Sequence, residues 1–165
     1  MRSLGIVTGL AGVLALAALA AAEDGDLQTT YCNFTDGSQI SIQYDGSGKH
    51  NEEPHNGKVW EPGGAPMTLY TQVPVVLNKV EIPVGAFAVY AIPNKKEWTL
   101  IVNRNVTPGS QYDPAQDLAR SPMELGDLSP PVKPVQVALA HMATKTCTLR
   151  ISYGSVGAQA DFLQK

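Results

Sequence analysis

Apolar and polar residues alternate with a period of two along much of this 165-residue chain, and this pattern restricts the fold more than any other feature. Residues 39–44 place their two isoleucines on one side of an extended segment, and residues 146–153 place their apolar side chains on one side in the same way. Such alternation is typical of strands with one buried face, whereas helices repeat apolar residues every three or four positions. The chain after its N-terminal segment is therefore predicted to be all-β.

Turn residues separate the alternating segments. Asp36-Gly37 and residues 94–96 are suited to hairpin turns, because Asp, Asn and Gly tolerate the backbone conformations that tight turns need. We predict an antiparallel β-sandwich of about nine strands, of jelly-roll type, with one short helical turn at residues 113–116. The expected strands are residues 28–35, 39–45, 67–73, 75–82, 86–92, 97–103, 118–125, 135–142 and 146–153, with a tenth candidate at 157–163.

The first 22 residues have the features of a signal peptide. Arg2 supplies a positive start, residues 4–22 carry no charge, and Ala20-Ala21-Ala22 offers the small residues that a signal peptidase needs. The alternative is an uncleaved membrane anchor, because about 20 apolar residues can span a bilayer. We predict a signal peptide over residues 1–22 and a single domain over residues 23–165. The protein is then periplasmic or secreted, with no membrane contact after cleavage.

Charge and motifs exclude several classes of function. The net charge is −3 and no basic cluster stands out, whereas nucleic-acid binding needs clustered Lys and Arg. The chain has no Gly-x-Ser-x-Gly, His-Glu-x-x-His or phosphate-binding glycine loop. We therefore assign no catalytic residue and expect no cofactor.

The two cysteines are predicted to form a disulfide. Cys32 is in phase with Phe34, and Cys147 is in phase with Leu149, so each lies on an apolar strand face. In an oxidising compartment such a pair is most simply a disulfide, although two separate buried thiols are the alternative. The bond would close a loop of about 114 residues. In the chain-entropy description, a loop of that length corresponds to roughly 4–5 kcal/mol of stabilisation.

A polar segment at residues 49–55 contains two histidines and two glutamates. Imidazole and carboxylate groups can hold zinc or copper, but the spacing matches no established metal motif. A solvated polar loop is the other interpretation. We predict no metal site, and His50 and His55 are the candidate ligands if one exists.

Two long loops, residues 45–66 and 104–117, are the predicted location of any ligand site, because binding residues are often carried by loops on a rigid scaffold. Aromatic faces with a few charges suit a sugar or a peptide. Trp60 has a second interpretation, as a core residue beneath the first loop. The candidate ligand-binding residues are Trp60, Glu61, Arg104, Tyr112 and Asp113.

Three segments between Gly57 and Glu124 read GKVWEPGGAPMTLYT, EIPVGAFAVYAIPNKKEWTLIVN and QYDPAQDLARSPME. They resemble the domain of unknown function 2911 family of secreted bacterial proteins, and the similarity extends more loosely over residues 31–162. Much of that family has Trp-Arg-Thr where this chain has Trp60 followed by Glu61 and Pro62. No role of that Arg and Thr can therefore be transferred. The resemblance implies a fold and an exported location, but no activity.

We therefore expect an exported bacterial protein that serves as a non-catalytic binding or structural domain of the cell envelope. Its expected partner is an unidentified small molecule, a glycan or an envelope protein. One alternative is a carbohydrate-active enzyme, for which two carboxylates about 5–10 Å apart in an aromatic-lined groove would be diagnostic. The other alternative is a metal-binding envelope protein that uses the His50–His55 loop, for which converging histidines would be diagnostic.

Overall fold

The computed structural model describes residues 27–50 and 52–165. The predicted signal peptide lies outside the described residues. Within these residues, no helix has the length and apolar character needed to cross a membrane.

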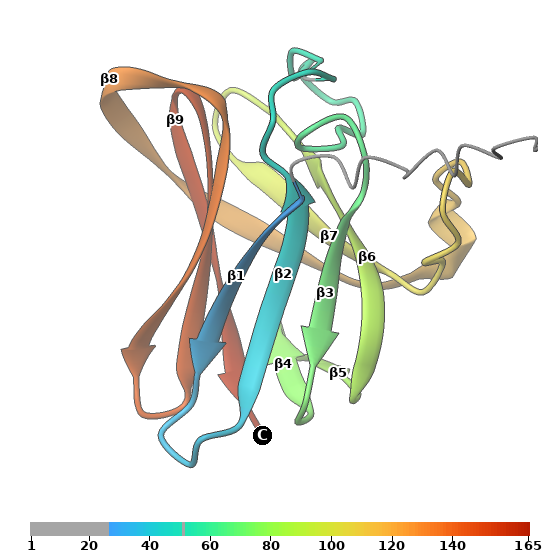
Figure 1. Cartoon of the computed structure of the whole chain (residues 1–165), viewed down its shortest axis with the longest axis vertical. Helices are drawn as coiled ribbons and strands as arrows, with labels where there is room; N and C mark the ends of the chain where they lie inside the picture. Colours follow the sequence, from blue (N-terminus) through green and yellow to red (C-terminus); the bar gives the residue numbers. More distant parts are fainter. Residues whose placement is uncertain (1–26, 51) are drawn as a thin grey trace, which may run out of the picture.

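Nine strands form one continuous antiparallel sheet in the order β1-β2-β3-β6-β7-β8-β9-β4-β5 (Figure 1). A single 3₁₀ turn, η1 (Pro114–Gln116), precedes β8. The predicted all-β, antiparallel class with one short helical turn is confirmed. The strands are β1 (Leu27–Asn33), β2 (Gln39–Asp45), β3 (Met67–Thr71), β4 (Val75–Leu77), β5 (Val80–Ile82), β6 (Gly85–Ile92), β7 (Trp98–Asn103), β8 (Asp117–Ala143) and β9 (Thr146–Gln164).

The long strand β8 belongs to both halves of the sheet. Its first part, residues 117–123, pairs with β7, and its later part, from Glu124 to Ala143, pairs with β9. The sheet also curls, which brings β8 close to β1. The backbone nitrogen of Leu139 in β8 donates a 2.9 Å hydrogen bond to Oγ1 of Thr30 in β1. The finer prediction of a jelly-roll-like sandwich is not confirmed, since the strands form one continuous sheet and are not divided between two separate ones.

Three expected strand boundaries are wrong. Segments 118–125 and 135–142 are parts of β8, and segments 146–153 and 157–163 are parts of β9. Prolines 130 and 131 do not end β8, because they fall where its pairing with β9 shifts register between Asp127 and Val132. Segment 75–82 is instead two short strands, β4 and β5, joined by a tight turn in which Asn78 and Lys79 both have positive φ.

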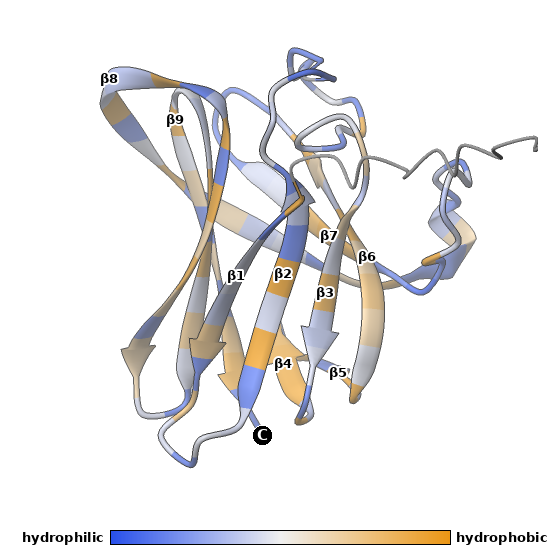
Figure 2. Ribbon diagram, viewed as in Figure 1, coloured by the Kyte–Doolittle hydropathy of each residue, from blue (hydrophilic) through white to orange (hydrophobic). Residues whose placement is uncertain are grey.

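The buried residues follow the alternation seen in the sequence (Figure 2). In β2, Ile40, Ile42 and Tyr44 are buried while the residues between them are half-exposed. Strands from both halves of the sheet contribute to this core. A second, small cluster lies on the opposite face of β6 and β7, where Tyr90 and Ile101 are buried. The 104–117 loop covers this cluster, so the central strands are buried on both faces.

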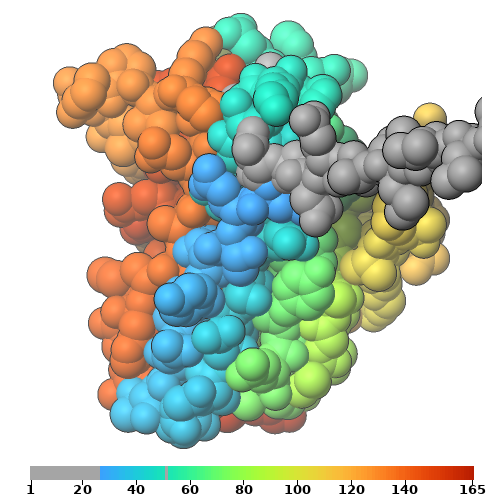
Figure 3. All heavy atoms as spheres, viewed as in Figure 1, coloured from blue at the N-terminus to red at the C-terminus, as the bar shows by residue number. Residues whose placement is uncertain are grey.

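The predicted disulfide is confirmed. Cys32 in β1 is bonded to Cys147 in β9, with 6.1 Å between their Cα atoms and a sequence separation of 115. Both residues are buried. The bond joins the first strand to the last, on the core side of the sheet. The opposite side of β1, β2 and β3 forms one face of the molecule in the space-filling view (Figure 3).

Candidate functional site

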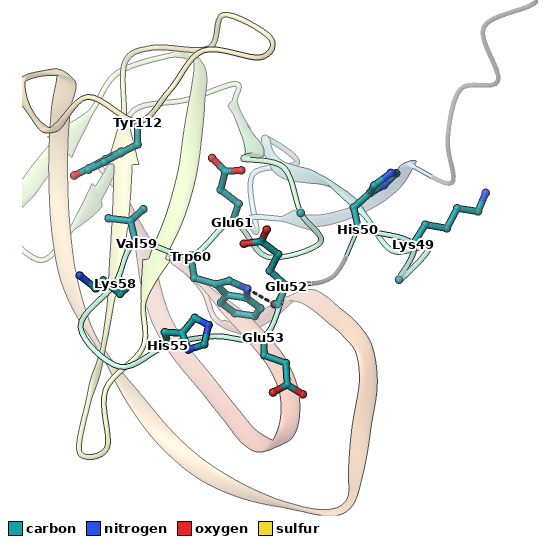
Figure 4. Close-up of a pocket in the computed structure, with 12 residues that line it drawn as sticks. Lys49, His50, Glu52, Glu53, His55, Lys58, Val59, Trp60, Glu61 and Tyr112 are labelled. Atoms are coloured by element: carbon teal, nitrogen blue, oxygen red, sulfur yellow. Dashed lines mark hydrogen bonds between the residues drawn. The ribbon is translucent and has the colours of Figure 1, made fainter.

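A pocket of about 670 Å³ brings the two predicted loops together (Figure 4). Its wall is made by residues within 48–50 and 52–64 and by Tyr112, which comes from the 104–117 loop. Of the five predicted ligand-binding residues, Trp60, Glu61 and Tyr112 line this pocket, whereas Arg104 and Asp113 do not. A larger groove of about 850 Å³ lies between the β4–β5 turn and parts of β8 and β9, and none of the predicted site residues lines it.

Trp60 forms the floor of the pocket and is a core residue. Its backbone makes two hydrogen bonds with Ala91 of β6, of 2.7 and 3.1 Å, which fix the loop to the sheet. Its indole Nε1 donates a 2.9 Å bond to the carbonyl oxygen of Glu52. The ring is only 4% exposed and packs edge-on against Trp98 and Tyr153, at 5.6 and 5.5 Å between centroids. Its faces are therefore used by the core.

Two adjacent glycines let the loop fold back on itself. Gly63 and Gly64 have φ of 94° and 86°, a conformation that side chains rarely adopt. A Cβ atom on Gly63 would collide with the carbonyl oxygen of Asp45, and one on Gly64 would collide with that of His50. The turn also contains a 2.8 Å bond from the nitrogen of Gly64 to the carbonyl oxygen of Glu61. The pair is therefore needed for this wall of the pocket.

Three glutamates surround Trp60 in different electrostatic settings. Burial raises the pKa of the half-buried Glu61 carboxyl above its ordinary value, and the charge of Glu52 raises it further. Lys133 donates a 3.0 Å bond to Glu53 and holds the pKa of that carboxyl below its ordinary value. Figure 4 shows the carboxylates of Glu52 and Glu61 on the same side of the indole and that of Glu53 on the other.

The two histidines lie apart in the pocket wall. His50 is 72% exposed, and its Nδ1 lies 3.6 Å from Oδ2 of Asp45. His55 lies on the other side of Trp60 in the close-up (Figure 4). Among the residues that the structure describes, no three His, Cys, Asp or Glu side chains gather as metal ligands. The arrangement of these histidines therefore gives no support to a metal site.

Tyr112 in the opposite wall is held by a ring contact and by hydrogen bonds. Its ring packs against Tyr90, and its hydroxyl donates a 2.8 Å bond to Oδ2 of Asp117. Arg120 in turn lies 2.7 Å from the same carboxylate oxygen and donates to the Tyr112 hydroxyl at 2.8 Å. Burial, followed by the neighbouring Asp117, raises the pKa of Tyr112 to about 12. The phenol therefore stays protonated at neutral pH.

Asp113 and Arg104 shape the loop that carries Tyr112. Asp113 caps η1, where its Oδ1 accepts a 2.9 Å bond from the nitrogen of Ala115. The guanidinium of Arg104 donates a 3.3 Å bond to the carbonyl oxygen of Asp117.

Glu52 and Lys58 were not among the predicted ligand-binding residues, although both line the pocket and lie within the 45–66 loop. Ligand binding by the pocket residues stays a prediction.

The chain matches the family described as "Protein of unknown function (DUF2911)" over residues 27–162. No curated protein and no solved structure matches the chain. The matched range contains the disulfide, the whole of the pocket wall and nearly all of β9. The protein is thus a member of the DUF2911 family, whose function is unknown.

Proposed function

We propose that the protein is an exported, non-catalytic binding domain of the bacterial envelope whose pocket holds a small hydroxyl-rich ligand, such as a fragment of a glycan. The observation that carries this proposal is the half-buried carboxylate of Glu61, which faces the pocket beside Glu52 and Tyr112. Carboxylates and aromatic side chains are common in sites that bind sugars. Sugar hydroxyl groups donate hydrogen bonds to the carboxylates, and the apolar faces of the sugar rings pack on the aromatic side chains.

The environment of Glu61 indicates which groups a ligand would bring. Among the described residues, no hydrogen-bond donor or cation contacts its carboxylate. A partly desolvated carboxylate without donors is unfavourable, which is why its pKa is raised. Hydroxyl groups of a ligand would supply the missing donors and would favour the charged form of Glu61.

Binding can be tested by isothermal titration with monosaccharides and disaccharides, after native mass spectrometry of protein purified from its host has shown whether a small molecule is retained. We expect Glu61→Gln to weaken binding by about tenfold, since a charged acceptor is replaced by a neutral one. Glu124→Gln is the matched control, because Glu124 is exposed in β8 and does not line the pocket. Equal binding by wild type and Glu61→Gln would contradict the proposal.

Export is supported by the disulfide, since such bonds persist in oxidising compartments, and by the composition of the first 22 residues. N-terminal sequencing of the exported protein should begin at Glu23 or at Ala21. Recovery of a chain that begins at Met1 in a membrane fraction would contradict cleavage.

A carbohydrate-active enzyme is the second candidate, and one observation favours it. A carboxyl with a raised pKa beside a charged carboxylate is the arrangement that glycoside hydrolases use for acid catalysis. Here Glu61 would be the proton donor and Glu52 the second carboxylate. Release of nitrophenol from a panel of nitrophenyl glycosides, lost in both Glu61→Gln and Glu52→Gln, would favour the enzyme over the binding domain.

A further inference from the structure

The outer face of β1, β2 and β3, which is the face seen in Figure 3, carries rows of side chains that run across the strands, and three of these rows consist of aromatic and uncharged polar residues. Paired residues in register point to the same face of a sheet, because side chains alternate along every strand. The residues between the rows, such as Ile40 and Ile42, face the core. The three rows are Tyr31–Ser41–Tyr70, Thr29–Gln43–Thr68 and Asn33–Gln39–Gln72.

The central row contains two exposed aromatic rings. Tyr31 is 61% exposed and Tyr70 is 44% exposed, and every other aromatic side chain in the described part of the chain is buried or half-buried. Ser41 lies between them and is too small to fill the space between the rings. Strands lie about 4.8 Å apart, so two strand spacings separate the tyrosines by about 10 Å, close to the length of two pyranose units in an extended chain.

None of the side chains in the three rows is charged at neutral pH. The next row of the same face, at the end of β2, is Leu27–Asp45, where Asp45 accepts a 2.8 Å bond from the nitrogen of Ser47 and lies 3.6 Å from Nδ1 of His50. The three rows themselves therefore offer no electrostatic attraction to an ionic partner.

The two flanking rows differ in their hydrogen bonding. Gln39 donates a 2.9 Å bond to Asn33 through its side chain, and its backbone nitrogen donates a 3.1 Å bond to Oε1 of Gln72. That row is thereby held in place. In the other row, the side chains of Thr29, Gln43 and Thr68 have no hydrogen-bond partner among the described residues, so their hydroxyl and amide groups are free for a ligand.

We propose that this face binds an uncharged, extended polysaccharide chain that lies across the strands. Its sugar rings would stack on Tyr31 and Tyr70, and its hydroxyl groups would bond to Gln43 and the neighbouring threonines. Flat aromatic rings accept the apolar faces of sugars, while amides and hydroxyls match sugar hydroxyls in both donor and acceptor roles. A ligand without charge complements these uncharged rows.

The same features are unsuited to other occupants. Nucleic acids and anionic membrane surfaces are recognised through Lys and Arg, and the three rows contain neither. A stable protein interface needs a well-packed, largely apolar centre, whereas here polar side chains surround two isolated rings. The proposal is also independent of the pocket around Trp60, since no residue of the three rows lines that pocket.

The test is isothermal titration of the folded mature protein with three neutral β-linked hexasaccharides: cellohexaose, xylohexaose and laminarihexaose. Tyr31→Thr and Tyr70→Thr remove a ring but keep a residue with high strand propensity. We expect the wild type to bind at least one hexasaccharide, more tightly than the corresponding disaccharide. Each single variant should weaken this binding by about tenfold, and the double variant should abolish it.

Two controls separate this face from the rest of the molecule. Met142→Thr replaces another exposed side chain, 68% exposed in β8, and should leave the affinity unchanged. Glu124→Gln removes a charge from an exposed position of β8, outside both the pocket around Trp60 and the three rows, and should also leave hexasaccharide binding unchanged. Thermal unfolding of every variant checks that it is folded. The proposal is wrong if no hexasaccharide binds at millimolar concentration, or if a hexasaccharide binds equally well to the folded double variant.

Discussion

The rings of Tyr112 and Tyr90 pack edge-on, with 4.9 Å between their centroids and 65° between their planes. Tyr90 lies on the outer side of β6, and Tyr112 comes from the loop that covers this side. The contact therefore fixes the one residue of the 104–117 loop that lines the pocket. The contact also shields Tyr112 from water, and this burial raises the pKa of its phenol.

Tyr112 should make the stability of the protein depend on alkaline pH. Its pKa is raised to about 12, whereas an unfolded tyrosine has a pKa of about 10. A raised pKa in the folded state means that the contribution is complete below pH 10 and is lost as the pH rises from about 10 to 12. Urea unfolding between pH 9 and 12 should show a steeper loss of stability in the wild type than in Tyr112→Phe. Parallel curves would contradict this prediction.

Trp60 should contribute both packing and a hydrogen bond. Trp60→Ala should lower the free energy of unfolding by about 3–5 kcal/mol, as expected for a large core side chain. Trp60→Phe keeps a ring but leaves the carbonyl of Glu52 without its donor. Trp98→Phe is the matched control, because its indole nitrogen bonds to no described residue. Denaturant unfolding should show a loss larger by about 1 kcal/mol in Trp60→Phe than in Trp98→Phe.

The disulfide should stabilise the protein substantially. Replacement of both Cys32 and Cys147 by alanine should lower the free energy of unfolding by about 2–5 kcal/mol. Non-reducing peptide mapping of the wild type should recover one linked pair of peptides containing these cysteines. Two free thiols in the folded, exported protein would contradict the bond.

Gly64→Ala should be more damaging than an alanine at another glycine with positive φ. Both Gly64, at 86°, and Gly109, at 72°, have the left-handed conformation, so the backbone strain of the substitution is similar. Only at Gly64 would the new Cβ collide with a carbonyl oxygen, that of His50, while Gly109 has open space around it. Thermal unfolding should therefore show a larger loss for Gly64→Ala. Equal losses would mean that the 45–50 segment moves away easily.

The sequence was sufficient to predict local features. The alternation in β2 identified which side chains are buried, and the phase of Cys32 and Cys147 identified the disulfide. Prolines 130 and 131 suggested a break between two strands, because proline donates no backbone hydrogen bond. The chain instead continues as one strand, since its pairing with β9 shifts register there, and sequence alone does not show such a shift. The alignment of Tyr31 and Tyr70 on either side of Ser41 could not be predicted either, since it depends on the register of three strands.

The pocket was only partly predictable for a related reason. The two long loops that form it were identified from their length and composition, and Glu61 and Tyr112 were named. The proximity of Glu52 to Glu61 depends on the backbone hydrogen bonds of Trp60 with Ala91 and on the close approach at Gly63 and Gly64. Such contacts between a loop and a distant strand have no local signal in a single sequence.

The sharing of β8 and β9 between distant parts of the sheet has a consequence for biosynthesis. The chain is synthesised from its N-terminus, yet β4 has one of its two partners in β9, and Cys32 has its partner in Cys147. Residues 27–116 therefore leave the ribosome with exposed strand edges and no means of closing the sheet. Such unpaired edges can pair with other chains until the 19-residue strand β9 supplies the missing partner. The closed sheet and its disulfide thus depend on a strand that is synthesised after all the strands with which it pairs.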